Sequence, residues 1–168
     1  MRPARPIIVA ICAGAGLFLA APAAAQSTHA SDMAVGASVV GECTVSVTEL
    51  NFGDAINPVL VTEIDMNGTV TVSCSDKAIF SMEMDYGTHA NGTQRRLRNA
   101  AGDYLNYQIY RNFNRTQVWA VKPTEKRNGI ILNGGGSEDY EAYGTLTGIT
   151  PSTPTGTYTD TITVTLTF

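Results

Sequence analysis

Histidine, cysteine and serine are the residue types that most often bind a metal or supply a nucleophile with its base. The two histidines outside any obvious motif, His29 and His89, are not at ligand spacing from each other or from a cysteine, so no metal site is predicted. No G-x-S-x-G segment is present, so Ser-His-Asp catalysis lacks its sequence pattern. The glycines at 134–136 lack the lysine and following helix of a phosphate-binding loop. The sequence therefore predicts no metal, no cofactor and no enzyme activity.

Charged and amide side chains could still form a site if folding brought them together. Three carboxylates are candidates for such pairing, although solvated loop positions are commoner: Asp103, Asp139 and Glu141. Three arginines form a small basic cluster, which we expect on a solvated loop near an acidic strand: Arg95, Arg96 and Arg98. Three asparagines begin N-x-T sequons, which we interpret mainly as turns: Asn67, Asn91 and Asn114. None of these groups alone indicates a reaction.

The N-terminal 25 residues have the pattern of a secretory signal peptide. Arg2 and Arg5 form a basic start, residues 7–19 are apolar, and three alanines at 23–25 offer a small-residue cleavage site before Gln26. A membrane anchor is the alternative, but the apolar run is short and ends at Pro22 and small residues rather than basic ones. We expect a mature chain of about 143 residues, enough for one domain with its own core.

Removal of the signal peptide changes both the charge and the number of cysteines. The formal net charge moves from −4 to −6, because Arg2 and Arg5 leave and no acidic residue does. An acidic surface argues against nucleic acid as a partner, since phosphate binding needs clustered Lys and Arg. Loss of Cys12 leaves Cys43 and Cys74, and an even number in an exported protein favours one disulfide. Two free buried thiols are the alternative.

Residues 157–168 form the clearest strand pattern. Threonine occupies every second position, and the alternate positions carry the inner face: Tyr158, Asp160, Ile162, Val164, Leu166 and Phe168. Side chains on a strand alternate between faces, so this pattern predicts a strand with an apolar inner side. Asp160 is its one inner charge, and we expect it near the sheet rim. Because no segment follows Phe168, we expect one side of this strand to need a partner from elsewhere.

A second alternating segment lies at the other end of the mature chain, in residues 33–40. Met33, Val35, Ala37 and Val39 fall on one face, and small residues fall on the other. An ordinary first strand or a linker would show the same pattern. This segment is nevertheless an apolar strand that the chain could offer as the missing partner.

The rest of the chain is also predicted to form short strands. Alternation predicts inward faces formed by three sets: Cys43, Val45 and Val47; Val70, Val72 and Cys74; and Phe80, Met82 and Met84. Further strands are expected at 59–66, 104–111 and 141–149, with a hairpin turn at Asn67-Gly68 and a short strand around Leu97. The order of weak strands between Val118 and Leu132 stays open. No 3.6-residue periodicity is sustained, so an all-β sandwich is predicted.

Several segments together resemble the spore coat protein U-like domain, the domain of archaic chaperone–usher pilus subunits. The matching segments follow the signal peptide in order: Cys43-Thr44-Val45; Leu50-Asn51-Phe52-Gly53; Val70-Thr71-Val72-Ser73-Cys74; Tyr107 with Tyr110-Arg111; and Gly156-Thr157-Tyr158-Thr159-Asp160-Thr161-Ile162-Thr163-Val164. No single segment is specific, but their order and spacing together are. The resemblance covers essentially the whole mature chain.

The resemblance implies an immunoglobulin-like β-sandwich that lacks its last strand and is completed by a donor strand. In that family a periplasmic chaperone first lends a strand. At an outer-membrane usher, the N-terminal extension of the next subunit then replaces it. The product is a head-to-tail, non-covalent fibre, expected here as a surface fimbrium in adhesion or biofilm formation.

Carried onto this sequence, the resemblance assigns roles to individual residues. The donor strand falls on Met33, Val35, Ala37 and Val39. The acceptor groove falls on Val45, Val47, Ile162, Val164, Leu166 and Phe168, and the family disulfide on Cys43 and Cys74. The implied organisation is a signal peptide at 1–25, an extension at 26–41 and a pilin domain at 42–168. A self-complete coat or surface-binding domain, exported in the same way, is the alternative.

Overall fold

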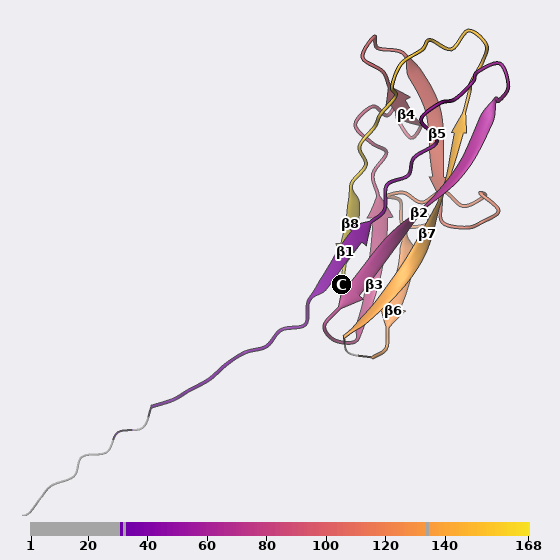
Figure 1. The fold of residues 1–168 in the computed structure, drawn as a ribbon. Helices are drawn as coiled ribbons and strands as arrows, with labels where there is room; N and C mark the ends of the chain where they lie inside the picture. Colours follow the sequence, from indigo (N-terminus) through magenta and orange to yellow (C-terminus); the bar gives the residue numbers. More distant parts are fainter. Residues whose placement is uncertain (1–30, 32, 134) are drawn as a thin grey trace, which may run out of the picture. The chain divides into compact units, whose positions relative to one another are not determined.

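A computed structural model describes residues 31, 33–133 and 135–168. Residues Val39–Phe168 form one compact unit, and the chain before them belongs to a separate unit. The described residues form eight strands and no helix (Figure 1): β1 (Cys43–Val47), β2 (Glu63–Cys74), β3 (Ala78–Met84), β4 (Arg95–Arg98), β5 (Tyr104–Tyr110), β6 (Arg127–Ile131), β7 (Gly136–Thr147) and β8 (Val164–Thr167). The predicted signal peptide lies outside the described residues.

The strands form two antiparallel sheets, as the sequence predicted for an all-β sandwich. One sheet has the order β1-β2-β7-β5-β4, and the other has the order β6-β3-β8. The long strands β2 and β7 pair over their whole length, from Glu63 opposite Thr147 to Cys74 opposite Gly136. Of the weak segments between Val118 and Leu132, only residues 127–131 become a strand, which pairs with β3 at the edge of the smaller sheet.

The core lies between the sheets and follows the predicted alternation. Every second residue is buried along the inner faces of β2, β3 and β5: Val70, Val72, Cys74, Phe80, Met82, Met84, Leu105, Tyr107 and Ile109. Trp119 is buried in the irregular segment after β5, and its indole N–H donates to the Met82 carbonyl at 3.2 Å. Local periodicity therefore sufficed to identify the inner faces.

The hairpin turn predicted at Asn67-Gly68 is wrong. Both residues lie inside β2, opposite Tyr143 and Ala142 of β7. A Cβ at Gly68 would lie 3.4 Å from the carbonyl oxygen of Thr48, an ordinary contact distance, so the packing there does not require glycine. The pairing of β2 with β7 along its whole length outweighs the local turn preference. The strand expected at 59–66 begins only at Glu63 and continues through the predicted turn to Cys74.

The other two asparagine sequons do lie in turns. Asn91 and Gln94 exchange backbone hydrogen bonds around Gly92, whose φ is +62°. Asn114 lies in a turn closed by the bond from Arg115 N–H to the Asn112 carbonyl at 3.0 Å. The turn interpretation is therefore correct where no long neighbouring strand competes for the backbone.

Arg95 contradicts the expectation of a solvated basic loop. It points inward from β4 and its relative exposure is 0%. Its guanidinium donates to the carbonyl oxygens of Asp85 and Trp119 and to the Gln108 side chain. These acceptors belong to both sheets and to the segment after β5, so Arg95 joins them. The alternation within β4 puts Arg96 outward, where its guanidinium lies 4.0 Å from the Tyr104 ring.

Candidate binding groove

Two edge strands on one side of the sandwich lack a second partner. Among the described residues, β1 pairs only with β2 and β8 pairs only with β3. The two edges belong to different sheets and lie beside each other without pairing (Figure 1). An edge strand leaves a row of backbone N–H and C=O groups unpaired, so this side of the molecule can accept a further strand.

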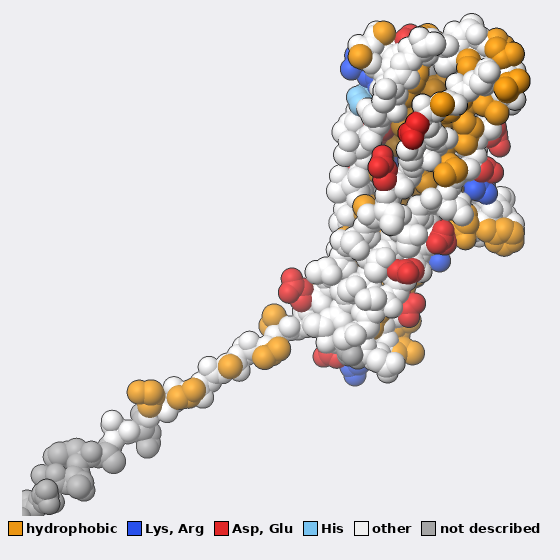
Figure 2. Space-filling model, viewed as in Figure 1, with side chains coloured by type: hydrophobic (Ala, Val, Ile, Leu, Met, Phe, Trp, Pro, Cys, Tyr) orange, Lys and Arg blue, Asp and Glu red, His pale blue; other side chains and the backbone are white. Residues whose placement is uncertain are grey.

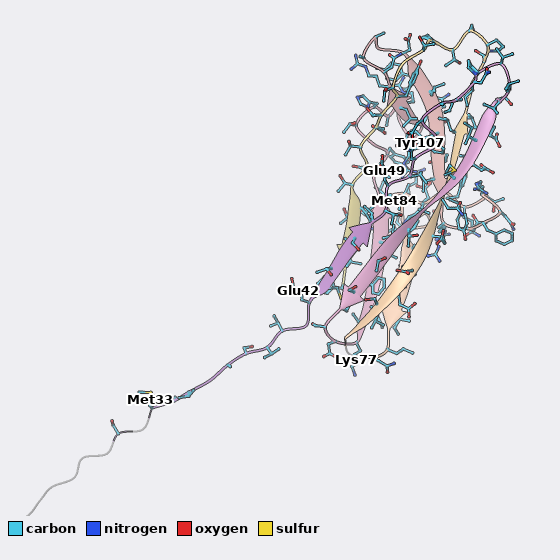
Figure 3. The ribbon with its side chains drawn as sticks, in the orientation of Figure 1. Met33, Glu42, Glu49, Lys77, Met84 and Tyr107 are labelled. Carbon is cyan, nitrogen blue, oxygen red and sulfur yellow. A yellow bond between two sulfur atoms is a disulfide. The ribbon has the colours of Figure 1, made fainter. Side chains whose placement is uncertain are left out.

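A large apolar hollow opens between the segment that follows β1 and the segment that precedes β8, and Val47 and Val164 are the residues of these two strands that line it. Its volume is about 650 Å³, and its floor comes mainly from inner faces of the larger sheet: Leu105, Tyr107, Ile109, Ala142 and Leu146. Met84 of the opposite sheet also lines it, and Figure 3 labels Met84 and Tyr107. The walls are residues 47–56 on one side and residues 153–160, 162 and 164 on the other. A second hollow of about 260 Å³ lies where β1 begins, between Cys43 and Phe168.

The six residues assigned to an acceptor groove lie on these two edges, but not all line a hollow. Val47, Ile162 and Val164 line the large hollow, and Phe168 lines the small one. Val45 and Leu166 line neither and are half-buried against the core. The structure adds Leu50 and Phe52 to the large hollow. Leu50 and Phe52 are two residues apart, so the alternation of a strand would have placed both side chains on the inner face. Acceptance of a donor strand stays a prediction.

The four donor residues lie in the extension, which forms no strand at positions 33–40. Met33, Val35, Ala37 and Val39 are all exposed. The described part of this segment therefore presents large apolar side chains to solvent. The donor role of these residues also stays a prediction.

The last segment of the chain crosses from one sheet to the other. Thr159 exchanges two backbone hydrogen bonds with Arg98 of β4, at 2.9 and 3.0 Å. The Thr161 and Thr163 carbonyls then accept from the backbone N–H groups of Thr88 and Asp85, and β8 finally pairs with β3. The predicted strand at 157–168 is thus shortened to four residues, because its hydrogen-bond partner changes along its length. The inward alternation nevertheless holds from Tyr158 to Leu166.

Asp160 lies at this crossing, on the inner side of the segment as the alternation predicted, and its side chain is only 1% exposed. The carboxylate accepts from the Tyr107 hydroxyl at 2.7 Å, the Thr88 hydroxyl at 2.8 Å and the His89 backbone N–H at 3.1 Å. The His89 Nδ1 atom lies 3.0 Å away. Burial alone would raise the pKa of Asp160, but the hydrogen bonds from Tyr107 and Thr88 hold it below its ordinary value. Burial raises the pKa of Tyr107, so its hydroxyl stays protonated and donates.

The model of the Spore Coat Protein U domain matches residues 29–165. The chain belongs to the Spore Coat Protein U domain family. Protein U of Myxococcus xanthus is 30% identical to it over 183 residues, with 100% of both chains covered.

The Spore Coat Protein U domain also has a structural neighbour of known architecture. This is the CsuC–CsuE chaperone–tip adhesion subunit pre-assembly complex from the archaic chaperone-usher Csu pili of Acinetobacter baumannii. The TM-score is 0.58 at 20% identity, with 77% of this chain and 40% of that chain covered. This likeness identifies the fold. The family and the fold together indicate a structural, non-enzymatic protein.

The disulfide of this Spore Coat Protein U domain is confirmed. Cys43 and Cys74 are bonded and face each other directly in the pairing of β1 with β2. The bond fastens the edge strand that forms one wall of the groove. Closing a loop of this length stabilises a fold by about 3–4 kcal/mol in the chain-entropy model.

The remaining polar candidates have partners within the domain. Asp139 and Glu141 accept from Thr71 and Thr69 across the β2–β7 pair, and Asp103 accepts from Asn99. The structure does not bring these three carboxylates into one cluster with shared partners. Within the described ranges no group of His, Cys, Asp and Glu could hold a metal, and no helix is long and apolar enough to cross a membrane. His29 lies outside those ranges.

Proposed function

We propose that this protein is a structural subunit of a chaperone–usher pilus that polymerises by donor-strand exchange. The observation that carries the proposal is the apolar hollow that adjoins two unpartnered edge strands, at the end of β1 and the start of β8, in a chain whose extension exposes alternating apolar residues. A strand from another copy would complete the ladder of β8 and cover the core. Residues 33–39 of the next copy are the proposed donor.

The burial energy of the donor side chains favours this exchange. Met33, Val35 and Val39 would each contribute about 1.5–3 kcal/mol on full burial. Ala37 contributes less, because its side chain is small. Backbone hydrogen bonds along β8 add to this and are shielded from water within the groove.

The place where the extension joins the domain sets the direction of the donor. The extension leads into β1 at Cys43, beside Phe168 at the small hollow. If the donor chain left the groove at this end, its own domain would collide with the extension of the acceptor. We therefore infer that the donor strand enters at the Phe168 end and runs toward Ile162, antiparallel to β8. The domain that follows the donor strand then lies at the opposite end of the acceptor. Such contacts are heterologous and produce an open filament.

The partners follow from the same groove. A strand-deficient domain exposes its core before assembly, so a periplasmic chaperone that lends a strand is the proposed first partner. An outer-membrane usher is the proposed site of exchange. This assigns the chain to export through the periplasm and to a cell-surface fimbrium with an adhesive or biofilm role. The predicted signal peptide at 1–25 and the CsuC–CsuE chaperone–subunit complex support this route.

A self-complete coat domain is the second candidate. The similarity to Protein U over its full length, and the description of the family as a Spore Coat Protein U domain, favour a coat function. In that case the extension would fill the groove of its own chain, and the product would be a stable monomer.

A peptide experiment tests strand donation, and an assembly experiment then separates the two candidates. The domain of residues 42–168, with Cys43–Cys74 oxidised, is melted with and without a peptide of residues 31–41. We expect a large rise in Tm with the native peptide, and a similar rise when the outward residues Ala34 and Ser38 are changed to Asp. The peptide with Val35→Asp and Val39→Asp should give no rise, and a domain that is already stable and responds to no peptide would refute strand donation by this segment. The chain of residues 26–168 is then examined for assembly: filaments support exchange between copies, whereas a stable monomer would refute it and favour the coat domain.

A further inference from the structure

The connection between the donor strand and its own domain is very short. If the fibre proposal holds, on which this inference rests, the donor ends at Val39 and β1 begins at Cys43. Only Val40, Gly41 and Glu42 lie between them. Four residue steps span at most about 14 Å when fully extended. The start of β1 in one copy must therefore lie close to the groove of the previous copy.

The direction of the donor decides which surfaces face each other. The Cys43 end of one copy meets the opposite end of the previous copy, where the loop at residues 54–62 leads into β2. Ile56 and Pro58 of this loop line the large hollow, so the loop borders the path of the donor. At the other end, Ile79 lines the small hollow together with Gly41 and Glu42. Both surfaces are therefore next to the three-residue connection.

The loop before β2 presents a well-ordered apolar tip. The Asn57 side-chain oxygen accepts from the Val59 N–H at 3.0 Å, and the Asn57 carbonyl accepts from the Leu60 N–H at 3.1 Å. This turn holds Val59 and Leu60 outward, with exposed fractions of 71% and 77%. Figure 2 shows hydrophobic side chains gathered on the surface over this loop. Large exposed aliphatic side chains on a fixed turn are typical of a contact surface.

The Cys43 end carries a matching apolar patch. Ile79 of β3 is 77% exposed and lies directly opposite Ile130 of β6 on the outer face of the smaller sheet. Leu132 continues this patch beyond the end of β6 and is also exposed. The charges at this end are mixed, Glu42 and Asp76 with Lys77, whereas Asp54 and Glu63 flank the other surface. The two ends carry no net opposite charge, so an attraction between them must come mainly from apolar burial.

We propose that the turn carrying Val59 and Leu60 packs on the patch formed by Ile79, Ile130 and Leu132 of the next copy. This is a second contact between neighbouring subunits, beside the donor strand. Since the contact joins different surfaces, it repeats along the filament and fixes the angle between successive domains.

Cysteine crosslinking in the mature chain tests this contact. The variant with Leu60→Cys and Ile79→Cys is assembled and then oxidised, and the products are separated under denaturing, non-reducing conditions. We expect a covalent ladder of multimers. The control with Phe113→Cys and Ile79→Cys should give several-fold less ladder, because Phe113 is equally exposed but lies in the loop after β5.

The outcomes separate this contact from the fibre proposal. Filaments that form by electron microscopy but crosslink no better at Leu60 than at Phe113 would overturn the contact and leave donor-strand exchange intact. A mature chain that forms no filaments would overturn both. A second variant, with Val59→Asp and Leu60→Asp, should still form filaments but with a several-fold shorter persistence length, and an unchanged persistence length would count against the contact.

Discussion

Replacement of Asp160 by Ala should destabilise this domain more than any other single change on the final segment. The carboxylate is buried, and three donors would lose their acceptor: the hydroxyls of Tyr107 and Thr88 and the backbone N–H of His89. A hydrogen bond to a charged group contributes about 1.5–3 kcal/mol, and a buried donor without a partner costs about 1–3 kcal/mol. These contributions overlap, so we expect a loss of about 3–5 kcal/mol, similar to breaking a buried charge pair. That is a large part of the stability of a typical domain.

Equilibrium unfolding in urea, with Cys43–Cys74 intact, measures this loss at pH 7. Tyr107→Phe is the matched variant, since it removes one donor and leaves the carboxylate in place, and it should cost about 1.5–3 kcal/mol. In the double variant the two effects should not add, and the coupling should lie between about 0.5 and 3 kcal/mol. A loss below about 1 kcal/mol for Asp160→Ala, or full additivity, would refute the argument that this network holds the final segment.

The same carboxylate predicts a pH dependence. Its pKa is lower in the folded protein than its ordinary value of 3.8, so the unfolded chain binds the proton more readily. The stabilisation is therefore fully present above about pH 5 and is lost as the pH falls through the folded pKa. His89 contacts the carboxylate directly, and the buried guanidinium of Arg95 lies close enough for a charge interaction with it. The Asp160→Ala variant should lose less stability than the wild type between pH 5 and pH 2, and an equal loss would contradict the assignment.

Three further changes test the rest of the groove and core. Reduction of Cys43–Cys74 should cost about 3–4 kcal/mol in urea unfolding, because it frees the edge strand β1 and enlarges the unfolded ensemble. Gly144→Ala should cost about 1–3 kcal/mol, since its Cβ would lie 2.5 Å from Leu50 Cδ2 and Leu50 must shift. Gly148→Asn should cost less, because its Cβ would meet nothing within 4 Å and only the backbone strain at φ +80° opposes it. Arg95→Met should cost about 3 kcal/mol by leaving the buried carbonyl groups of Asp85 and Trp119 unpaired; a change below about 1 kcal/mol would mean that water replaces the guanidinium.

Much of the architecture could be predicted from local patterns. Alternation placed Phe80, Met82 and Met84 on one buried face, because the two-residue period of a strand needs no knowledge of its neighbours. The same reasoning identified the inward residues of the final segment and both cysteines. It failed at Asn67-Gly68, where a turn signal lies inside β2, because the long pairing with β7 outweighs a two-residue preference.

Local sequence patterns did not predict the hydrogen-bonded polar side chains of the interior. Arg95 was expected on a solvated loop, and Asp160 on the inner face near the sheet rim, since sequence gives the face on which a residue lies but not the groups that meet it there. Arg95 becomes buried because the carbonyl groups of Asp85 and Trp119 and the side chain of Gln108 meet around it. Asp160 becomes buried because the final segment crosses between sheets at that residue, beside Tyr107 and Thr88.

The sequence by itself determined the strand content, the inner faces and the presence of an apolar segment near each end of the mature chain. Only the tertiary structure decided that β1 and β8 are edges of different sheets that lie side by side, with a hollow of about 650 Å³ where β1 ends and β8 begins. The physical reason is that faces follow from the covalent geometry of one strand, whereas edges and cavities follow from the order in which distant strands pair. That order is set by the whole core at once.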